Sequence, residues 1–236
     1  QQKDYNTGIE LIEKSLKINN KNYSALNNLG NFFLELKKYP EAIEKYKKAL
    51  NLNENYTAAI YNLGNAYKAI SKFNIALEYY YKAIISNPRF FEAYYDYAEL
   101  LERVGRIEDA LKYYYKLLEL NPSHPYLLGS IVRSKLNICQ WESLSLEVEE
   151  IKKNLFRKKI INAFDILFIT DSLEQQVEVI KKFSEDKFPT INNSFNFKDN
   201  NNNNKIKIGY YSSDFSNHPV GYSIVQLFEF HNKEKF

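Results

Sequence analysis

Residues 57–88 read TAAIYNLGNAYKAISKFNIALEYYYKAIISNP, and the pattern of this segment recurs before and after it. A shift of 34 residues places Leu63-Gly64 on Leu29-Gly30 and on Tyr97-Ala98. The same shift aligns a large residue followed three positions later by a small one, in the pairs Tyr5 and Gly8, Tyr39 and Ala42, Phe73 and Ala76, and Ile107 and Ala110. A fixed period of this length predicts stacked pairs of helices.

The pattern resembles the tetratricopeptide repeat, in which large, Leu-Gly, aromatic, Ala, aromatic and Pro residues follow at set spacings. The segment carries this series, except for its first residue, at Ile60, Leu63, Gly64, Tyr67, Ala76, Tyr80 and Pro88. Small residues let two antiparallel helices approach closely while the tyrosines fill the remaining space. We predict a half unit at 1–22 that begins in its second helix, and three full units at 23–56, 57–90 and 91–124.

The composition excludes several classes of protein. The 236 residues are 44% hydrophobic and 26% charged, with a net charge of +3. No stretch approaches the roughly 20 apolar residues of a membrane span, and the small net charge does not indicate a nucleic-acid binder. A single cysteine allows no internal disulfide and no cysteine metal cluster, which favours a cytoplasmic location. Because the sequence contains no Met, we expect a fragment of a longer protein.

Two columns of polar residues are candidates for a peptide-binding site. The first helices of stacked pairs line the concave side of such an array. Asn28, Asn62 and Asp96 form one column there, and Asn31 and Asn65 lie one turn further on. Each amide both donates and accepts hydrogen bonds and could hold an extended peptide by its backbone. The alternative is a solvated polar face in a chain rich in Asn.

Residues 125–188 are predicted to be a helical linking region, because the 34-residue step stops after Pro122 while helical periodicity continues. We expect helices at 126–137, 141–153, 158–169 and 173–186, the last capped by Asp171 or Ser172. Trp141 and Phe164 are interpreted as core residues, and Cys139 as a buried thiol.

The last part of the chain changes character. Residues 189–204 are an Asn-rich linker with five consecutive Asn at 200–204. Residues 205–212 alternate as a strand does, and a helix is expected at about 219–231, where Pro219 favours its first turn. The predicted fold is therefore mainly α, with the first strand and helix of a truncated α/β domain at 205–236.

Residues 207–219, KIGYYSSDFSNHP, resemble the entry to the catalytic region of the O-linked N-acetylglucosamine transferases, including bacterial and SPINDLY-type members. The segments 124–126, 138–141 and 185–189 are similar to that family's link between repeats and catalysis. The resemblance implies a GT-B-type domain that needs no metal and transfers N-acetylglucosamine from UDP-N-acetylglucosamine to Ser or Thr hydroxyls of acceptor proteins. It also implies that His218 is an active-site residue, as a general base or as a group that orients the acceptor.

The family's concave Asn ladder maps onto Asn28 and Asn62, whereas Asp96 and Gly221-Tyr222 depart from the family pattern. Since the donor-binding lobe would lie beyond this sequence, the fragment is expected to be inactive. Two alternatives stay open: a SPINDLY-type protein O-fucosyltransferase that uses GDP-fucose, and a non-enzymatic repeat adaptor. Homodimer formation is also open, because no patch in the sequence identifies an interface.

Overall fold

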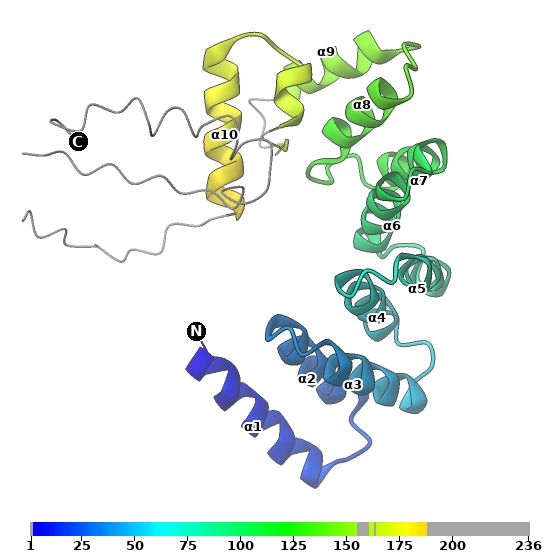
Figure 1. The fold of residues 1–236 in the computed structure, drawn as a ribbon, viewed down its shortest axis with the longest axis vertical. Helices are drawn as coiled ribbons and strands as arrows, with labels where there is room; N and C mark the ends of the chain where they lie inside the picture. Colours follow the sequence, from blue (N-terminus) through cyan, green and yellow to red (C-terminus); the bar gives the residue numbers. More distant parts are fainter. Residues whose placement is uncertain (1, 155–160, 163, 188–236) are drawn as a thin grey trace, which may run out of the picture. The chain divides into compact units, whose positions relative to one another are not determined.

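The computed structural model describes residues 2–154, 161–162 and 164–187, and over these residues it contains helices and no strand. Helix α1 spans Gln2–Ile18. Three helical pairs follow: α2 (Tyr23–Glu35) with α3 (Tyr39–Leu52), α4 (Thr57–Ala69) with α5 (Phe73–Ser86), and α6 (Phe91–Arg103) with α7 (Ile107–Leu120). Each helix packs on the next along the chain (Figure 1). The prediction of a helical-repeat array is thereby confirmed, while the domain boundaries at 124, 188 and 204 stay predictions.

The two helices of a pair approach most closely where a glycine faces a tyrosine. A Cβ atom built on Gly64 would lie 2.6 Å from the ring of Tyr80, and one built on Gly30 would lie 2.5 Å from the ring of Tyr46. Both tyrosines are fully buried. Glycine is therefore required at these positions by the space that the ring occupies, not by backbone conformation.

The turn between the two helices of a pair has the same geometry four times. Lys37, Ser71, Gly105 and Cys139 have φ angles of 58°, 59°, 84° and 55° and follow one another at intervals of 34 residues. In each turn the next residue donates its backbone N–H to a carbonyl five residues earlier, at 2.8–2.9 Å, as in Gln140 to Lys135. This is the Schellman arrangement, which satisfies the last carbonyl groups of a helix.

The fourth turn shows that the array continues beyond Pro122. It joins α8 (Leu127–Asn137) to α9 (Leu144–Asn154), and α8 packs on α7. Our prediction that the 34-residue step stops after Pro122 is therefore wrong: the backbone repeats, although the small side chains that reveal the period in the sequence do not.

The fourth pair, α8 with α9, is less tightly packed than the first three, because larger residues replace the small ones. Val132 stands in the place of Ala98, and Leu144 in that of Ala110. The second helix begins at Leu144 instead of the predicted 141. Trp141 is 64% exposed and Cys139 is also exposed, so the prediction that both are buried is wrong.

Beyond α9 lie the short 3₁₀ helix η1 (Asp165–Phe168) and α10 (Leu173–Lys187). The helix predicted at 158–169 is wrong over 161–162, which is not helical, and residues 155–160 lie outside the described residues. Phe164 is 62% exposed and not a core residue, because η1 buries Asp165 and Ile166 instead. The predicted cap Ser172 is confirmed: its side chain accepts the N–H of Gln175 at 3.5 Å.

Residues 188–236 lie outside the described residues, and with them the predicted linker at 189–204, the strand at 205–212 and the helix at 219–231. Within the described part, no helix is both long enough and apolar enough to span a bilayer.

Candidate peptide-binding site

The predicted polar residues lie on the first helices of three successive pairs. Asn28 and Asn31 belong to α2, Asn62 and Asn65 to α4, and Asp96 to α6. We call the surface formed by these five residues the amide face. Asn28 is exposed and the other four are half-buried.

Two asparagines of the amide face are fixed by buried tyrosines. The hydroxyl of Tyr46 donates to Oδ1 of Asn31 at 2.8 Å, and that of Tyr80 donates to Oδ1 of Asn65 at 2.7 Å. Burial raises the pKa of both tyrosine hydroxyls well above the usual value, so each hydroxyl keeps its proton and remains a donor. The tyrosine that fills the gap next to each glycine therefore also sets the orientation of an amide.

Hydrogen bonds cross from each first helix to the next with an offset of 35 residues. Nδ2 of Asn62 donates to Oδ1 of Asn27 at 2.9 Å, and the hydroxyl of Tyr61 donates to Asp96. The hydroxyls of Tyr95 and Ser130 lie 3.0 Å apart. The comparison of residues 34 positions apart does not find Asn27, Tyr61 and Tyr95, because their hydrogen-bond partners lie 35 positions away. Polar residues that pair at 35 residues are the signal that would have found them.

Asn62 and Asp96 are therefore engaged between units rather than free. The NH₂ group of Asn62 also donates to Oδ1 of Asn31 at 2.9 Å. Asp96 additionally pairs with Lys68 at 3.1 Å, and the same ammonium group lies 3.6 Å from Glu99. The NH₂ group of Asn65 lies within hydrogen-bonding reach of the Tyr61 hydroxyl. The donors left over on the amide face are therefore the amide of exposed Asn28 and the NH₂ group of Asn31, from which no hydrogen bond is found among the described residues.

A cluster of charges ties the last units together. Arg133 of α8 reaches Glu102 of α6 at 3.1 Å and Asp165 of η1 at 2.7 Å. Asp165 is 1% exposed, and burial raises the pKa of its carboxyl group although Arg133 opposes that shift. The described residues hold no group of three or more His, Cys, Asp or Glu that could bind a metal ion. The cluster is a structural junction.

His218, the catalytic residue implied by the sequence resemblance, lies outside the described residues. Its role and the donor site stay predictions.

Three models of tetratricopeptide repeats match the chain, over residues 11–44, 30–71 and 61–125. Residues 11–125 are tetratricopeptide repeats. Together with α8 and α9, these tetratricopeptide repeats make a longer helical array than the sequence models cover.

Solved structures share the tetratricopeptide-repeat fold. A crystal structure of MamA is 23% identical, with a TM-score of 0.61, and covers 66% of this chain and 92% of its own. YrrB, described as a repeat protein with an unusual peptide-binding site, is 17% identical with a TM-score of 0.53 and covers 76% of this chain and 84% of its own. PilF of Pseudomonas aeruginosa is 23% identical with a TM-score of 0.53, and covers 61% of this chain and 66% of its own. A comparison with curated proteins gives no match.

Proposed function

We propose that the tetratricopeptide repeats bind extended peptide segments of partner proteins along the amide face. The observation that carries this proposal is the fixed amide of Asn31, whose carbonyl oxygen accepts from both Tyr46 and Asn62. Because the oxygen is held on two sides, the NH₂ group is presented in one orientation. A donor that is already ordered costs less entropy when it binds a ligand.

An extended peptide suits this face because its carbonyl groups need donors at regular intervals. The exposed amide of Asn28 lies three residues before Asn31 on the same helix, and residues three or four apart share one face of a helix. YrrB, which shares the fold, has a peptide-binding site by its own description.

The test is to replace donors without disturbing the packing. In Asn31→Asp, one carboxylate oxygen can still accept from Tyr46 and Asn62, while the second oxygen replaces the NH₂ group. We would pan a random dodecapeptide display library on the full chain and measure the selected peptides against the Asn28→Asp/Asn31→Asp variant. Loss of two donors facing peptide carbonyls predicts binding weaker by about tenfold or more.

A matched control has the same added charge elsewhere. Asn19 and Asn87 each accept a nearby backbone N–H with Oδ1, so Asn19→Asp/Asn87→Asp keeps those bonds. The control is expected to bind as the wild type does. Equal binding by all three proteins would show that the amide face is only a solvated surface.

The finer proposal is that these repeats select acceptor proteins for an O-linked N-acetylglucosamine transferase of which this chain is a part. It is supported by the resemblance of residues 207–219 to the entry of that catalytic region. His218 would act beside the acceptor hydroxyl, and UDP-N-acetylglucosamine would be the donor. A protein O-fucosyltransferase that uses GDP-fucose and a repeat adaptor without catalysis are the competing proposals.

Both nucleotide sugars should be assayed with the complete protein and one acceptor protein. Transfer from UDP-N-acetylglucosamine alone, lost in His218→Ala, is the expected result. Transfer from GDP-fucose alone would favour the second proposal, and transfer from neither would favour the adaptor. Cytoplasmic location and dimer formation stay predictions.

A further inference from the structure

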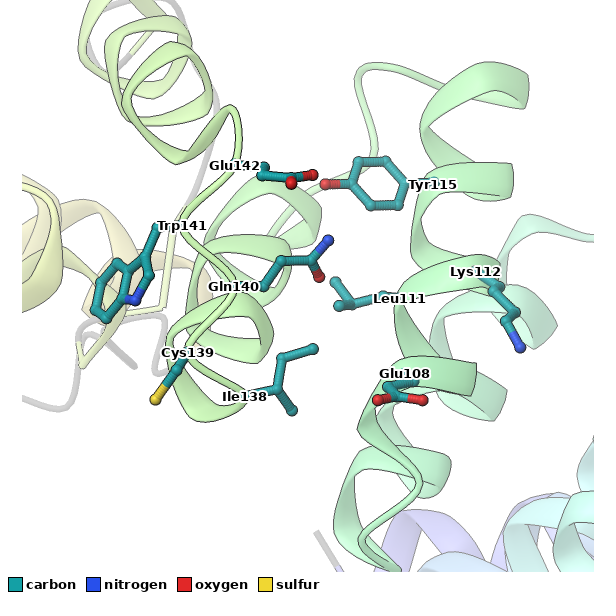
Figure 2. A pocket seen from close by; sticks show the side chains of 9 residues that line it. All are labelled: Glu108, Leu111, Lys112, Tyr115, Ile138, Cys139, Gln140, Trp141 and Glu142. Carbon is teal, nitrogen blue, oxygen red and sulfur yellow. The ribbon is translucent and has the colours of Figure 1, made fainter.

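A groove on a different surface from the amide face lies between α7 and residues 138–142, the segment that leads from α8 into α9. It is an open cleft of about 770 Å³ (Figure 2). Its origin is the loose packing of the fourth pair: α9 begins only at Leu144, so the non-helical residues 138–142 lie beside α7.

The groove has an apolar floor and polar ends. Leu111 of α7 and Ile138 contribute the apolar surface, and Gln140 points toward α7 (Figure 2). Tyr115 is held in place because its hydroxyl donates to Glu147 at 2.6 Å. The side chains of Cys139 and Trp141 extend on the other side of the segment (Figure 2).

The charge of the groove is negative. The carboxylate groups of Glu108 and Glu142 lie toward its two ends (Figure 2), and neither forms an ion pair within the described part of the chain. Lys112 offsets them only in part, because it pairs with Asp109 at 2.9 Å, a carboxylate that Arg106 also contacts at 2.8 Å. Lys135 is 1% exposed and pairs with Glu147, so its charge is also compensated.

We propose that this groove binds an extended basic peptide segment of a partner protein. One apolar side chain of the peptide packs on Leu111 and Ile138, and a Lys or Arg on either side of it pairs with Glu108 and Glu142. Gln140 supplies both a donor and an acceptor for the peptide backbone. Charge complementarity selects a basic partner and excludes an acidic one.

The test uses the full chain and a fluorescent probe peptide, Gly-Ser-Lys-Ala-Leu-Ala-Lys-Ser-Gly, with a second peptide in which both Lys are Glu. We expect the basic peptide to bind and to shift the methyl NMR signals of Leu111 and Ile138, and the acidic peptide not to bind. Glu108→Gln/Glu142→Gln should weaken binding about fivefold, since each exposed ion pair contributes modestly. Gln140→Trp, which fills the groove from an exposed position, should abolish it.

Glu41→Gln/Glu78→Gln removes two exposed carboxylates from α3 and α5 and serves as the matched control for net charge. It should bind the basic peptide as the wild type does. The proposal is overturned if the basic peptide does not bind, if both glutamate variants weaken binding equally, or if the signals that shift belong to the amide face. Since that face is tested separately by Asn28→Asp/Asn31→Asp, the two proposals fail independently.

Discussion

The hydroxyls of Tyr95 and Ser130 lie 3.0 Å apart, and Ser130 belongs to α8, beyond the residues that the repeat models match. The pair repeats the relationship of Tyr61 to Asp96 and of Asn27 to Asn62, each across 35 residues. α8 therefore occupies the place of a further first helix, and the linking region is bonded to the repeats in the same way as the repeats are to one another.

Loss of the bond between Tyr95 and Ser130 should destabilise the end of the array. Ser130 is 1% exposed, and apart from Tyr95 its hydroxyl contacts only the guanidinium group of Arg133, at 3.5 Å, so either variant loses a hydrogen bond that solvent does not replace at Ser130. We expect Ser130→Ala and Tyr95→Phe each to lower the free energy of unfolding by about 1 kcal/mol. Urea denaturation of both variants and of the double variant measures the coupling, and strictly additive effects would show that the two hydroxyls do not interact.

Gly64→Ala should lower stability although alanine is the better helix former. Helix propensity alone would add about 1 kcal/mol of stability. The new methyl group would instead lie 2.6 Å from the ring of fully buried Tyr80, and overpacking costs about 1–3 kcal/mol. Thermal unfolding distinguishes the two effects by sign. A stabilised variant would mean that the ring of Tyr80 moves aside without cost.

Arg133→Met should loosen η1 and α10 from the rest of the array. Arg133 is the cation that Asp165 and Glu102 share, and its removal would leave the buried carboxyl of Asp165 without a partner. Breaking such a pair costs about 3 kcal/mol. In Arg133→Met, amide hydrogen exchange should become faster than in the wild type at residues 164–187, and the increase should be larger there than at residues 57–69. Equal protection in variant and wild type would show that apolar packing holds this junction.

Stability should decline in alkaline solution because of the buried tyrosines. Burial raises the pKa of Tyr95 to about 12 and that of Tyr114 further, whereas an unfolded tyrosine titrates near 10. A group whose pKa is raised by folding contributes stability below its unfolded pKa and loses that contribution as the pH rises through the folded value.

The free energy of unfolding should therefore fall between pH values of about 10 and about 12, as urea denaturation at several pH values would show. Tyr95→Phe should show a smaller fall than the wild type. A fall of the same size in both proteins would exclude Tyr95 as a contributor.

The regular repeats could be predicted from the sequence because their packing depends on a few residue sizes. Gly64 and Ala76 mark the close approach of two helices, and Tyr80 marks the space between them. The fourth pair, α8 with α9, could not be found in this way, since Val132 and Leu144 replace the small residues while the turn at Cys139 keeps the backbone geometry of the other turns. The prediction that Trp141 is a core residue fails for the same reason: an aromatic residue near the start of a second helix is buried only if that helix packs tightly against the first.

The sequence predicts on which helices the candidate site residues lie, but not which hydrogen bonds their side chains form. The sequence places Asn62 and Asp96 correctly on first helices, but a 34-residue comparison does not show that their side chains contact residues of adjacent first helices. Hydrogen-bond partners depend on the rotation between neighbouring units, which residue spacing alone does not specify. The amides available to a ligand, Asn28 and Asn31, become distinguishable only when those contacts are known.

Cys139 gives the turn between α8 and α9 a practical use. It is the only cysteine of the 236 residues, and its thiol is exposed beside the groove. A maleimide dye would therefore attach at one known place without any engineered mutation. The natural sequence thus provides a fluorescence reporter for occupancy of the groove, next to the segment that a ligand would touch.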